Sequence, residues 1–177
     1  AWAYATAGHA APPLFAAIAE AAAPRTREFK PQELASTAWA FATASCPAPA
    51  LFDAIAAEAA AASLDAFAPQ ALTNLAWAYA TAGHASPALY DAIASEWVKR
   101  IAAGKGSFNG QDLANTAWAY VTADHPSEML FGSPCFVDRC IELDAQGEGF
   151  ALEGRCQLHQ WQLWQEERGA TWPPLPP

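Results

Sequence analysis

Positive charge is scarce in this sequence. Nine Lys and Arg residues are outnumbered by eighteen Asp and Glu residues, which sets the formal net charge at −9. Phosphate groups are held mainly by Lys and Arg, so this balance disfavours nucleic-acid binding that depends on phosphate contacts alone. The deficit is largest near the C-terminus, because residues 124–167 contain nine acidic residues but only Arg139 and Arg155 as basic ones.

Signatures of membrane proteins and of metal sites are also lacking. There is no charge-free apolar run of the roughly 18 residues that a membrane-spanning helix needs, so we expect no membrane span. None of the four cysteines forms a C-x-x-C pair, which predicts reduced thiols in an intracellular compartment and no metal site. These cysteines are Cys46, Cys135, Cys140 and Cys156.

Motifs for catalysis are missing as well. The sequence has no Ser/His/Asp order, no glycine loop that could cradle phosphate and no pair of catalytic carboxylates. We therefore predict a binding protein rather than an enzyme, with no catalytic residue, no cofactor and no small-molecule substrate. Because the chain lacks an initial Met and begins inside a repeat, we expect a fragment, with any targeting peptide upstream.

What the sequence does contain is alanine and a repeat. Alanine, the residue with the highest helix propensity, supplies 46 of the 177 residues. Nearly the same nine residues recur around Trp2, Trp39, Trp77 and Trp118, at intervals of 37, 38 and 41 residues. Twelve residues after each Trp comes a Leu that is followed by an aromatic residue. This spacing predicts a degenerate repeat of about 38 residues.

Each repeat is predicted to contain two helices. The first follows a phenylalanine (Phe29, Phe67 or Phe108), and the second begins at a proline (Pro12, Pro49 or Pro87). Asn109 and Ser86 are suitable N-caps, and Gly83 is placed as a C-terminal glycine. Stacked helix pairs of this kind form solenoids. The predicted fold is all-α, an α-solenoid of antiparallel helix pairs over residues 1–131.

Helical periodicity separates two faces of the first helix in each repeat. At about 100° per residue, Leu72, Ala76 and Tyr79 share a core face. The opposite face carries three neutral polar residues in each repeat, which we call the polar stripe. The polar stripe consists of Gln32, Ser36, Thr43, Gln70, Asn74, Thr81, Gln111, Asn115 and Thr122.

The polar stripe has more than one interpretation. Aligned Gln, Asn and Thr side chains, one set per repeat, suit the reading of unstacked RNA bases, as helical-repeat RNA readers do it. The same side chains could instead be solvated, or could form ladders between repeats. The tryptophans at the border of the stripe also have two interpretations, since they could stack on bases or pack between neighbouring helices.

Basic residues are concentrated in two turns between repeats. The candidates for contact with phosphate are Arg25, Arg27, Lys30, Lys99, Arg100 and Lys105. Alternatively, these cations complement the negative C-terminal ends of the second helices.

Histidines and acidic residues also recur. A histidine follows the first helix of three repeats (His9, His84 and His125). Histidines from different repeats do not make one coordination sphere, so we expect capping or loop packing. Acidic pairs such as Asp91 with Glu96 recur in the second helix, where we expect a solvated face.

The repeat pattern ends after Phe131. Residues 132–177 are predicted to be a degenerate helical segment, with one helix over 135–145 and another over 152–167. The apolar face of the last helix is predicted to comprise Leu158, Trp161, Leu163 and Trp164. The closing WPPLPP is predicted to be extended polyproline-type chain.

The repeated segments resemble octotricopeptide repeats. They read FKPQELASTAWAFATA, FAPQALTNLAWAYATAGH and FNGQDLANTAWAYVTADH, and the resemblance covers residues 1–131. The family pattern has Thr where this chain has Leu75, and Pro where it has Gly110. LHQWQLW, residues 158–164, is similar to the segment that precedes the RAP domain in algal RAP and FAST-kinase-like proteins, so a RAP domain could follow this chain.

The resemblance implies an organellar RNA-binding protein. Such a protein would bind single-stranded RNA in the mitochondrial matrix or the chloroplast, and act in the processing, stability or translation of transcripts. The alternative function is a protein–protein interaction scaffold, since solenoids offer long concave surfaces to either kind of partner.

Overall fold

Every regular element in the computed structural model is helical, within the residues that it describes: 1–61, 63–104, 108–132, 134–146 and 150–169. The α-helices are α1 (Trp2–Thr6), α2 (Pro12–Ala22), α3 (Pro31–Thr43), α4 (Pro49–Ala61), α5 (Pro69–Ala82), α6 (Pro87–Ala102), α7 (Gly110–Thr122), α8 (Glu128–Phe131), α9 (Cys135–Ala145) and α10 (Leu152–Glu167). Two short 3-10 helices, η1 (Ala23–Glu28) and η2 (Leu64–Ala66), accompany them. The all-α prediction is confirmed, and the arrangement is compatible with an α-solenoid.

Helices begin where the sequence predicts. Proline occupies the first position of α2, α3, α4, α5 and α6, where its missing N–H leaves no helical hydrogen bond unmade. α7 begins with a capping box, because the backbone N–H of Asp112 donates to Asn109 Oδ1 at 2.9 Å and the N–H of Asn109 donates to Asp112 Oδ2 at 3.1 Å. The prediction for Ser86 is wrong, since its side chain makes no capping hydrogen bond at the start of α6.

Four helices end in the same way. After α1, α3, α5 and α7 the backbone enters the left-handed region at Gly8, Ser45, Gly83 and Asp124, with φ between 48° and 63°. In the turns at Ser45, Gly83 and Asp124 the next backbone N–H donates to the carbonyl of Phe41, Tyr79 or Tyr120. Glycine adopts this conformation without strain, whereas Ser45 and Asp124 do not, so two of the four ends carry a backbone cost.

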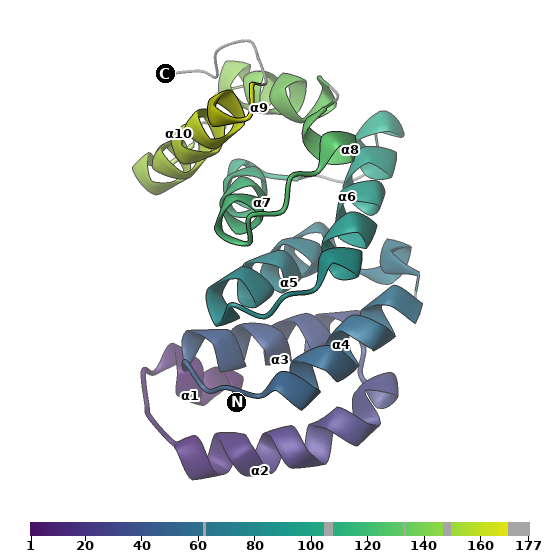
Figure 1. The fold of residues 1–177 in the computed structure, drawn as a ribbon, viewed down its shortest axis with the longest axis vertical. Coiled ribbons are helices and arrows are strands. Elements are labelled where there is room, and N and C mark those ends of the chain that lie inside the picture. The colour runs from purple at the N-terminus through teal and green to yellow at the C-terminus, as the bar shows by residue number, and fades with distance from the viewer. Residues whose placement is uncertain (62, 105–107, 133, 147–149, 170–177) are drawn as a thin grey trace.

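The helices form two curved layers (Figure 1). The inner layer contains α1, α3, α5, α7 and α10, each packed on the next. The outer layer contains α2, α4, α6, α8 and α9, whose members touch one another less extensively than the inner helices do. The inner helices therefore form the more closely packed of the two rows.

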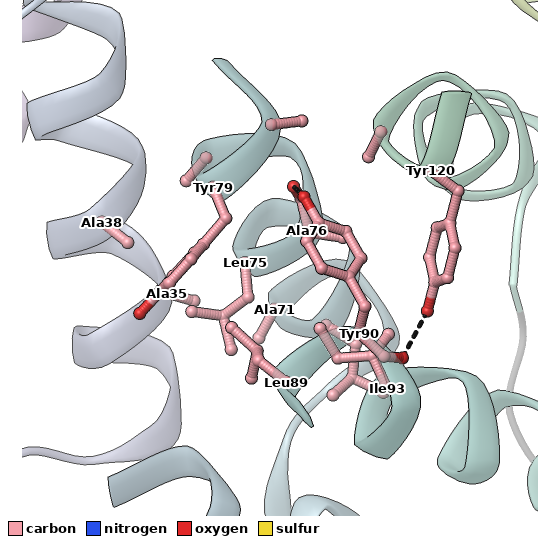
Figure 2. Close-up of a cluster of buried hydrophobic side chains, with 14 of the residues drawn as sticks. Ala35, Ala38, Ala71, Leu75, Ala76, Tyr79, Leu89, Tyr90, Ile93 and Tyr120 are labelled. Atoms are coloured by element: carbon pink, nitrogen blue, oxygen red, sulfur yellow. Dashed lines mark hydrogen bonds between the residues drawn. The ribbon is translucent and has the colours of Figure 1, made fainter. Parts of the chain in front are cut away.

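The core lies between the two layers (Figure 2). Leu72, Ala76, Tyr79, Leu89 and Ile93 are all buried, as the periodicity predicts. Apolar side chains of this kind provide the main favourable free energy of folding. Polar groups are also satisfied here, because the three buried tyrosine hydroxyls all donate to backbone carbonyls of a neighbouring helix. The bonds run from Tyr79 to Phe52 (2.6 Å), from Tyr90 to Ala76 (2.9 Å) and from Tyr120 to Tyr90 (2.7 Å).

The C-terminal helices occupy the predicted ranges, and α10 packs on α7 as the last member of the inner layer. Leu158, Trp161 and Trp164 are buried there. The prediction for Leu163 is wrong, because its side chain is 47% exposed. Trp161 and Trp164 already fill the face toward α7, α8 and α9, and Leu163 lies on the other side of the helix. None of the described helices is long and apolar enough to cross a membrane.

Candidate nucleic-acid interface

The polar stripe lies on the inner layer, on α3, α5 and α7. Its Gln and Thr residues are exposed, and its central residues, Ser36, Asn74 and Asn115, are half-buried. The helix faces predicted from the periodicity are therefore confirmed. Neutral donors and acceptors line the inner helices, while the core residues of the same helices point toward the outer layer.

The tryptophans at the border of the stripe stack on one another. The ring centroids of Trp39 and Trp77 are 6.3 Å apart with an angle of 30° between the planes, and those of Trp77 and Trp118 are 6.1 Å apart at 28°. Offset stacking at such distances is favourable. All three rings remain half-buried. We call this row the tryptophan stack; it packs neighbouring inner helices together and still presents ring surface beside the stripe.

The central residues of the stripe differ in their hydrogen bonds. Asn115 Oδ1 accepts from Gln111 Nε2 at 3.0 Å, and also from Gln157 Nε2 of α10 at 3.1 Å. Asn74 occupies the same place on α5, and within the described part of the chain its side chain has no hydrogen-bond partner. The amide of Asn74 is thus free to bind a ligand, whereas one end of the Asn115 amide is already occupied.

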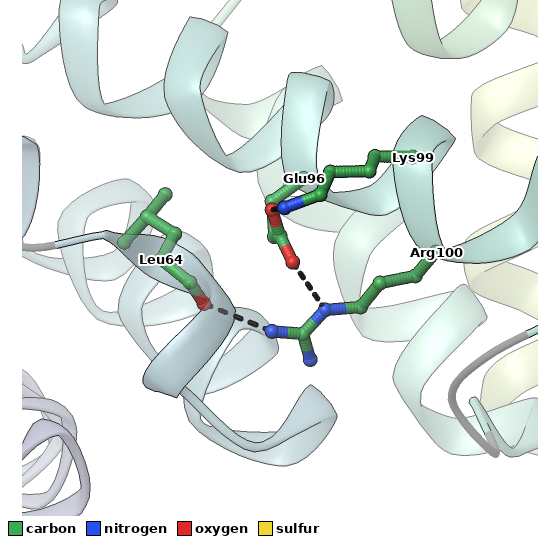
Figure 3. Close-up of polar contacts among 4 residues, drawn as sticks. All are labelled: Leu64, Glu96, Lys99 and Arg100. Atoms are coloured by element: carbon green, nitrogen blue, oxygen red, sulfur yellow. Dashed lines mark hydrogen bonds and ion pairs between the residues drawn. The ribbon is translucent and has the colours of Figure 1, made fainter. Parts of the chain in front are cut away.

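Two of the candidate phosphate contacts, Arg100 and Lys99, pair with Glu96 within the protein (Figure 3). Arg100 donates to Glu96 Oε1 at 2.6 Å and to the carbonyl of Leu64 at 2.9 Å, and Lys99 donates to Glu96 Oε2 at 3.1 Å. Glu96 is only 7% exposed, so the expectation of a solvated face is wrong for this residue. A buried carboxylate needs such partners, because removing it from water without them is costly. Arg100 therefore holds α6 to η2.

The remaining basic candidates are more accessible. Arg25 pairs with Glu28 at 2.6 Å on the surface, where the hydrogen bond and the charge of Glu28 raise the pKa of Arg25. Arg27 and Lys30 are exposed. Lys105 lies outside the described residues. Few of the described basic candidates are thus left to solvent without an acidic partner, which agrees with the small number of Lys and Arg residues in the sequence.

A contact between a histidine and an aspartate recurs at the C-terminal ends of the inner helices, and it was not predicted. His84 Nε2 lies 2.9 Å from Asp53 Oδ1, and His125 Nε2 lies 2.9 Å from Asp91 Oδ1. Each histidine ring also packs against the aromatic residue that precedes its aspartate, with ring centroids 5.4 Å and 5.3 Å apart. These contacts join the end of one inner helix to the outer helix of the preceding repeat.

The sequence does contain a signal for this contact. The repeat that has Cys46 at the histidine position is preceded by one that has Ala16 at the aspartate position. Histidine and aspartate are therefore present together at two junctions and absent together at the third. Pairing each histidine with the aspartate of the preceding repeat, about 31–34 residues earlier, would have predicted the contact.

Burial shifts pKa values on the helices that carry the polar stripe. Burial raises the pKa of Asp112, and the hydrogen bond from the backbone of Asn109 opposes that shift. Burial likewise raises the pKa values of the Tyr79 and Tyr120 hydroxyls on the core side of the same helices. No group of His, Cys, Asp and Glu within the described ranges could hold a metal ion. The side chains of the polar stripe itself are neutral Gln, Ser, Asn and Thr residues, which can donate and accept hydrogen bonds.

Comparison with known proteins gives no identification. No protein-family model matches the chain, and no curated protein matches it either.

Proposed function

We propose that this chain is an α-solenoid of antiparallel helix pairs, with a repeat of about 38 residues, that binds single-stranded RNA along its inner layer. One observation carries the proposal: the polar stripe runs in register over three successive inner helices, next to the tryptophan stack. Single-stranded RNA exposes base edges for hydrogen bonding and base faces for stacking, and such a surface complements both.

The cellular role follows from the resemblance to octotricopeptide repeats. We propose that the protein acts in the processing, stability or translation of mitochondrial or plastid transcripts, and that it is not an enzyme. Sequence recognition would come from the stripe, with Arg27, Lys30 and Lys99 as the candidates for phosphate contact. Arg100 is bound to Glu96 and Leu64 with its side chain only 11% exposed, whereas Lys99 also pairs with Glu96 but is 63% exposed.

A second candidate function is a protein–protein scaffold. It is favoured by the net charge of −9 and by three exposed aspartates, Asp53 on α4, Asp91 on α6 and Asp124 just after α7. An acidic edge repels phosphate and attracts basic protein segments. The RNA-binding function predicts that the chain binds single-stranded RNA, whereas the scaffold function predicts that it does not.

Fluorescence anisotropy with short labelled RNAs at two salt concentrations tests the proposal. We expect tighter binding to single strands than to duplexes of the same length, with a shallow salt dependence because few counterions are displaced. Lys99→Ala combined with Arg27→Ala should weaken binding to all sequences alike. Each lost phosphate contact should lower the salt slope by about 1. Equal binding of duplex and single strand, or no binding at low salt, would refute RNA recognition by the stripe.

A further inference from the structure

The junction between α7 and α10 contains an interaction that bears on which parts of the polar stripe can read bases. We infer that Gln157 of α10 closes the stripe at Asn115, so that α3 and α5 present open reading positions while the position on α7 is blocked. The inference rests on the proposed function and deepens it by separating the open positions from the closed one.

The first argument is the occupancy of the Asn115 amide. Its Oδ1 accepts two hydrogen bonds, from Gln111 and Gln157, whereas the amide of Asn74 accepts none among the described residues. Asn recognises a base edge most specifically by using its oxygen and its nitrogen together. Asn74 has both available. Asn115 has only one end of its amide left, so it cannot make the two-point contact without first breaking existing bonds.

The second argument is the burial of Gln157. Its side chain is only 8% exposed, and its Oε1 has no hydrogen-bond partner. Within the described residues, the bond to Asn115 is therefore the one hydrogen bond that the buried Gln157 amide makes. A base that displaced it would leave both ends of the Gln157 amide buried and unpaired, which is the costly outcome for a polar group. The contact thus resists competition by a ligand.

The third argument is the close approach of α10 to α7. A Cβ atom added at Gly154 would lie 3.2 Å from Cβ of Ala114, tighter than ordinary van der Waals contact. Glycine at this position lets the two helices approach, and Gln157 follows one turn later on the same face. The backbone packing therefore places Gln157 over Asn115.

The test compares the two asparagines in binding to a panel of single-stranded RNAs that differ at one base. Asn74→Ala should reduce the discrimination between the preferred and the substituted RNAs roughly tenfold, as loss of a two-point base contact does. Asn115→Ala should change discrimination by less than about twofold, because a closed position contributes no base contact. Equal effects of the two substitutions, with Gln157 intact, would overturn the inference.

Removal of the blocking residue provides the second arm. Gln157→Ala should open the position, so that Asn115→Ala in the Gln157→Ala background changes base preference by several-fold, at a base that the unsubstituted chain ignores. Gln160→Ala, an exposed change on α10, is the matched control and should leave the base preference unaltered. If Asn115→Ala remains silent in the Gln157→Ala background, Gln157 is not the block and the inference fails.

The design separates this inference from the proposed function. Absence of RNA binding by the unsubstituted chain overturns both. RNA binding with equal contributions from Asn74 and Asn115 overturns only the closure by Gln157. The first comparison leaves α10 unchanged, so it decides the question even if Gln157→Ala loosens that helix.

Discussion

The junctions within the inner layer are built in two different ways. Between α3 and α5, and between α5 and α7, the contacts come from repeated residues, namely the tryptophan stack and, toward the outer layer, the tyrosine hydroxyls and the His–Asp contacts. Between α7 and α10 each contact joins a residue of the repeat motif to one outside it, on α10 or just after it. These are the Gln157 bond to Asn115, and the bonds of Trp164 and Arg168 to Asp124.

The difference shows that a helix without the repeat motif can still extend the inner layer. Trp161 is fully buried among Phe131 and Phe136, with ring centroids 5.3 Å and 5.4 Å away, so α10 has an aromatic core contact of its own. Arg168 also stacks over the Trp164 ring at 4.2 Å, which adds a cation–π contact. The repeated junctions use the same contacts at regular positions, including one His–Asp contact each, whereas the α7–α10 junction uses a local network around Asp124 together with the Gln157–Asn115 bond.

The largest expected effect comes from removing core volume at each kind of junction. Leu72→Ala should lower the free energy of unfolding by about 2–5 kcal/mol, and Trp161→Ala by about 3–5 kcal/mol, because both side chains are fully buried and leave cavities. Denaturant unfolding measures both, and amide hydrogen exchange shows which helices open. In a row of nearest-neighbour contacts, Leu72→Ala should affect α3, α5 and α7, and Trp161→Ala mainly α9 and α10.

The matched control for the C-terminal junction is Leu152→Ala on α10. Leu152 is 79% exposed, so its truncation should change stability by no more than about 0.5 kcal/mol. If Leu72→Ala were equally silent, the assignment of the core face of the inner helices would be wrong.

High pH should destabilise the α3–α5 and α5–α7 junctions rather than the α7–α10 junction. Burial raises the folded-state pKa values of Tyr79 and Tyr120 above the ordinary value of 10.0. A raised pKa contributes stability that is fully present below pH 10 and is lost as the pH rises toward the folded-state value, because only the unfolded chain releases the protons. Each of the two tyrosines should therefore lower the free energy of unfolding by up to about 1.4 kcal/mol for each pH unit above pH 10.

Tyr79→Phe removes one of the two buried hydroxyls and so measures its contribution to this pH dependence. Near neutral pH we expect a loss of about 1 kcal/mol, since the hydroxyl no longer donates to the Phe52 carbonyl. Above pH 10 the variant should lose stability less steeply than the unsubstituted chain. Urea unfolding at several pH values measures both effects. Parallel pH dependences for the two proteins would contradict the role assigned to burial of this hydroxyl.

A smaller effect contrasts the ends of α3 and α7. Ser45 and Asp124 have the same left-handed backbone conformation, with φ of 50° and 48°. Ser45→Gly should stabilise the protein by about 1 kcal/mol, because glycine adopts this conformation without strain. Asp124→Gly should gain the same backbone term but lose the hydrogen bonds from Trp164 and Arg168, so its net stability should be lower than that of Ser45→Gly.

Thermal unfolding of the two glycine variants measures this contrast. A third variant, Asp124→Asn, keeps an acceptor for Trp164 and removes the charge next to Arg168. We expect it to retain more stability than Asp124→Gly. Equal gains from the two glycine substitutions would mean that the network around Asp124 contributes nothing to the junction.

The smallest expected effect concerns the His–Asp contacts. A double-mutant cycle with His84→Ala and Asp53→Ala should give a coupling free energy of about 0.2–1 kcal/mol, since the contact lies at the surface. Introducing the pair at the junction that lacks it, through Ala16→Asp with Cys46→His, should give a coupling of the same sign and size. A coupling of zero in both cycles would leave only the packing of the histidine rings as their contribution.

Much of the fold could be predicted because local signals and periodicity agree. Proline at the first helical position, the capping box of Asn109 and the glycine at position 83 each define a helix end within a few residues. The helical period then separates Leu72 and Tyr79 from Asn74. These inferences depend only on the geometry of a single helix, which is the same wherever the helix lies in the protein.

The candidate site was predicted less completely. The nine residues of the polar stripe were assigned to the correct face, but nothing in one helix shows that Asn115 is occupied and Asn74 is free. The burial of Glu96 and the exposure of Leu163 were also missed. In each case the missing information is the position of a neighbouring helix, such as η2 for Arg100 and Glu96.

By itself, the sequence determined the helices, their ends and the side of each that faces the core, because these follow from residue propensities and a period of 3.6 residues per turn. Only the tertiary structure decided which side chains from different helices meet. That outcome depends on the stagger and the distance between packed helices, which small residues such as Gly154 and Ala114 set at the point of contact. The bond of Gln157 to Asn115, and with it the proposed end of the reading surface, exists because α10 approaches α7 closely enough for the buried amide of Gln157 to reach the half-buried amide of Asn115.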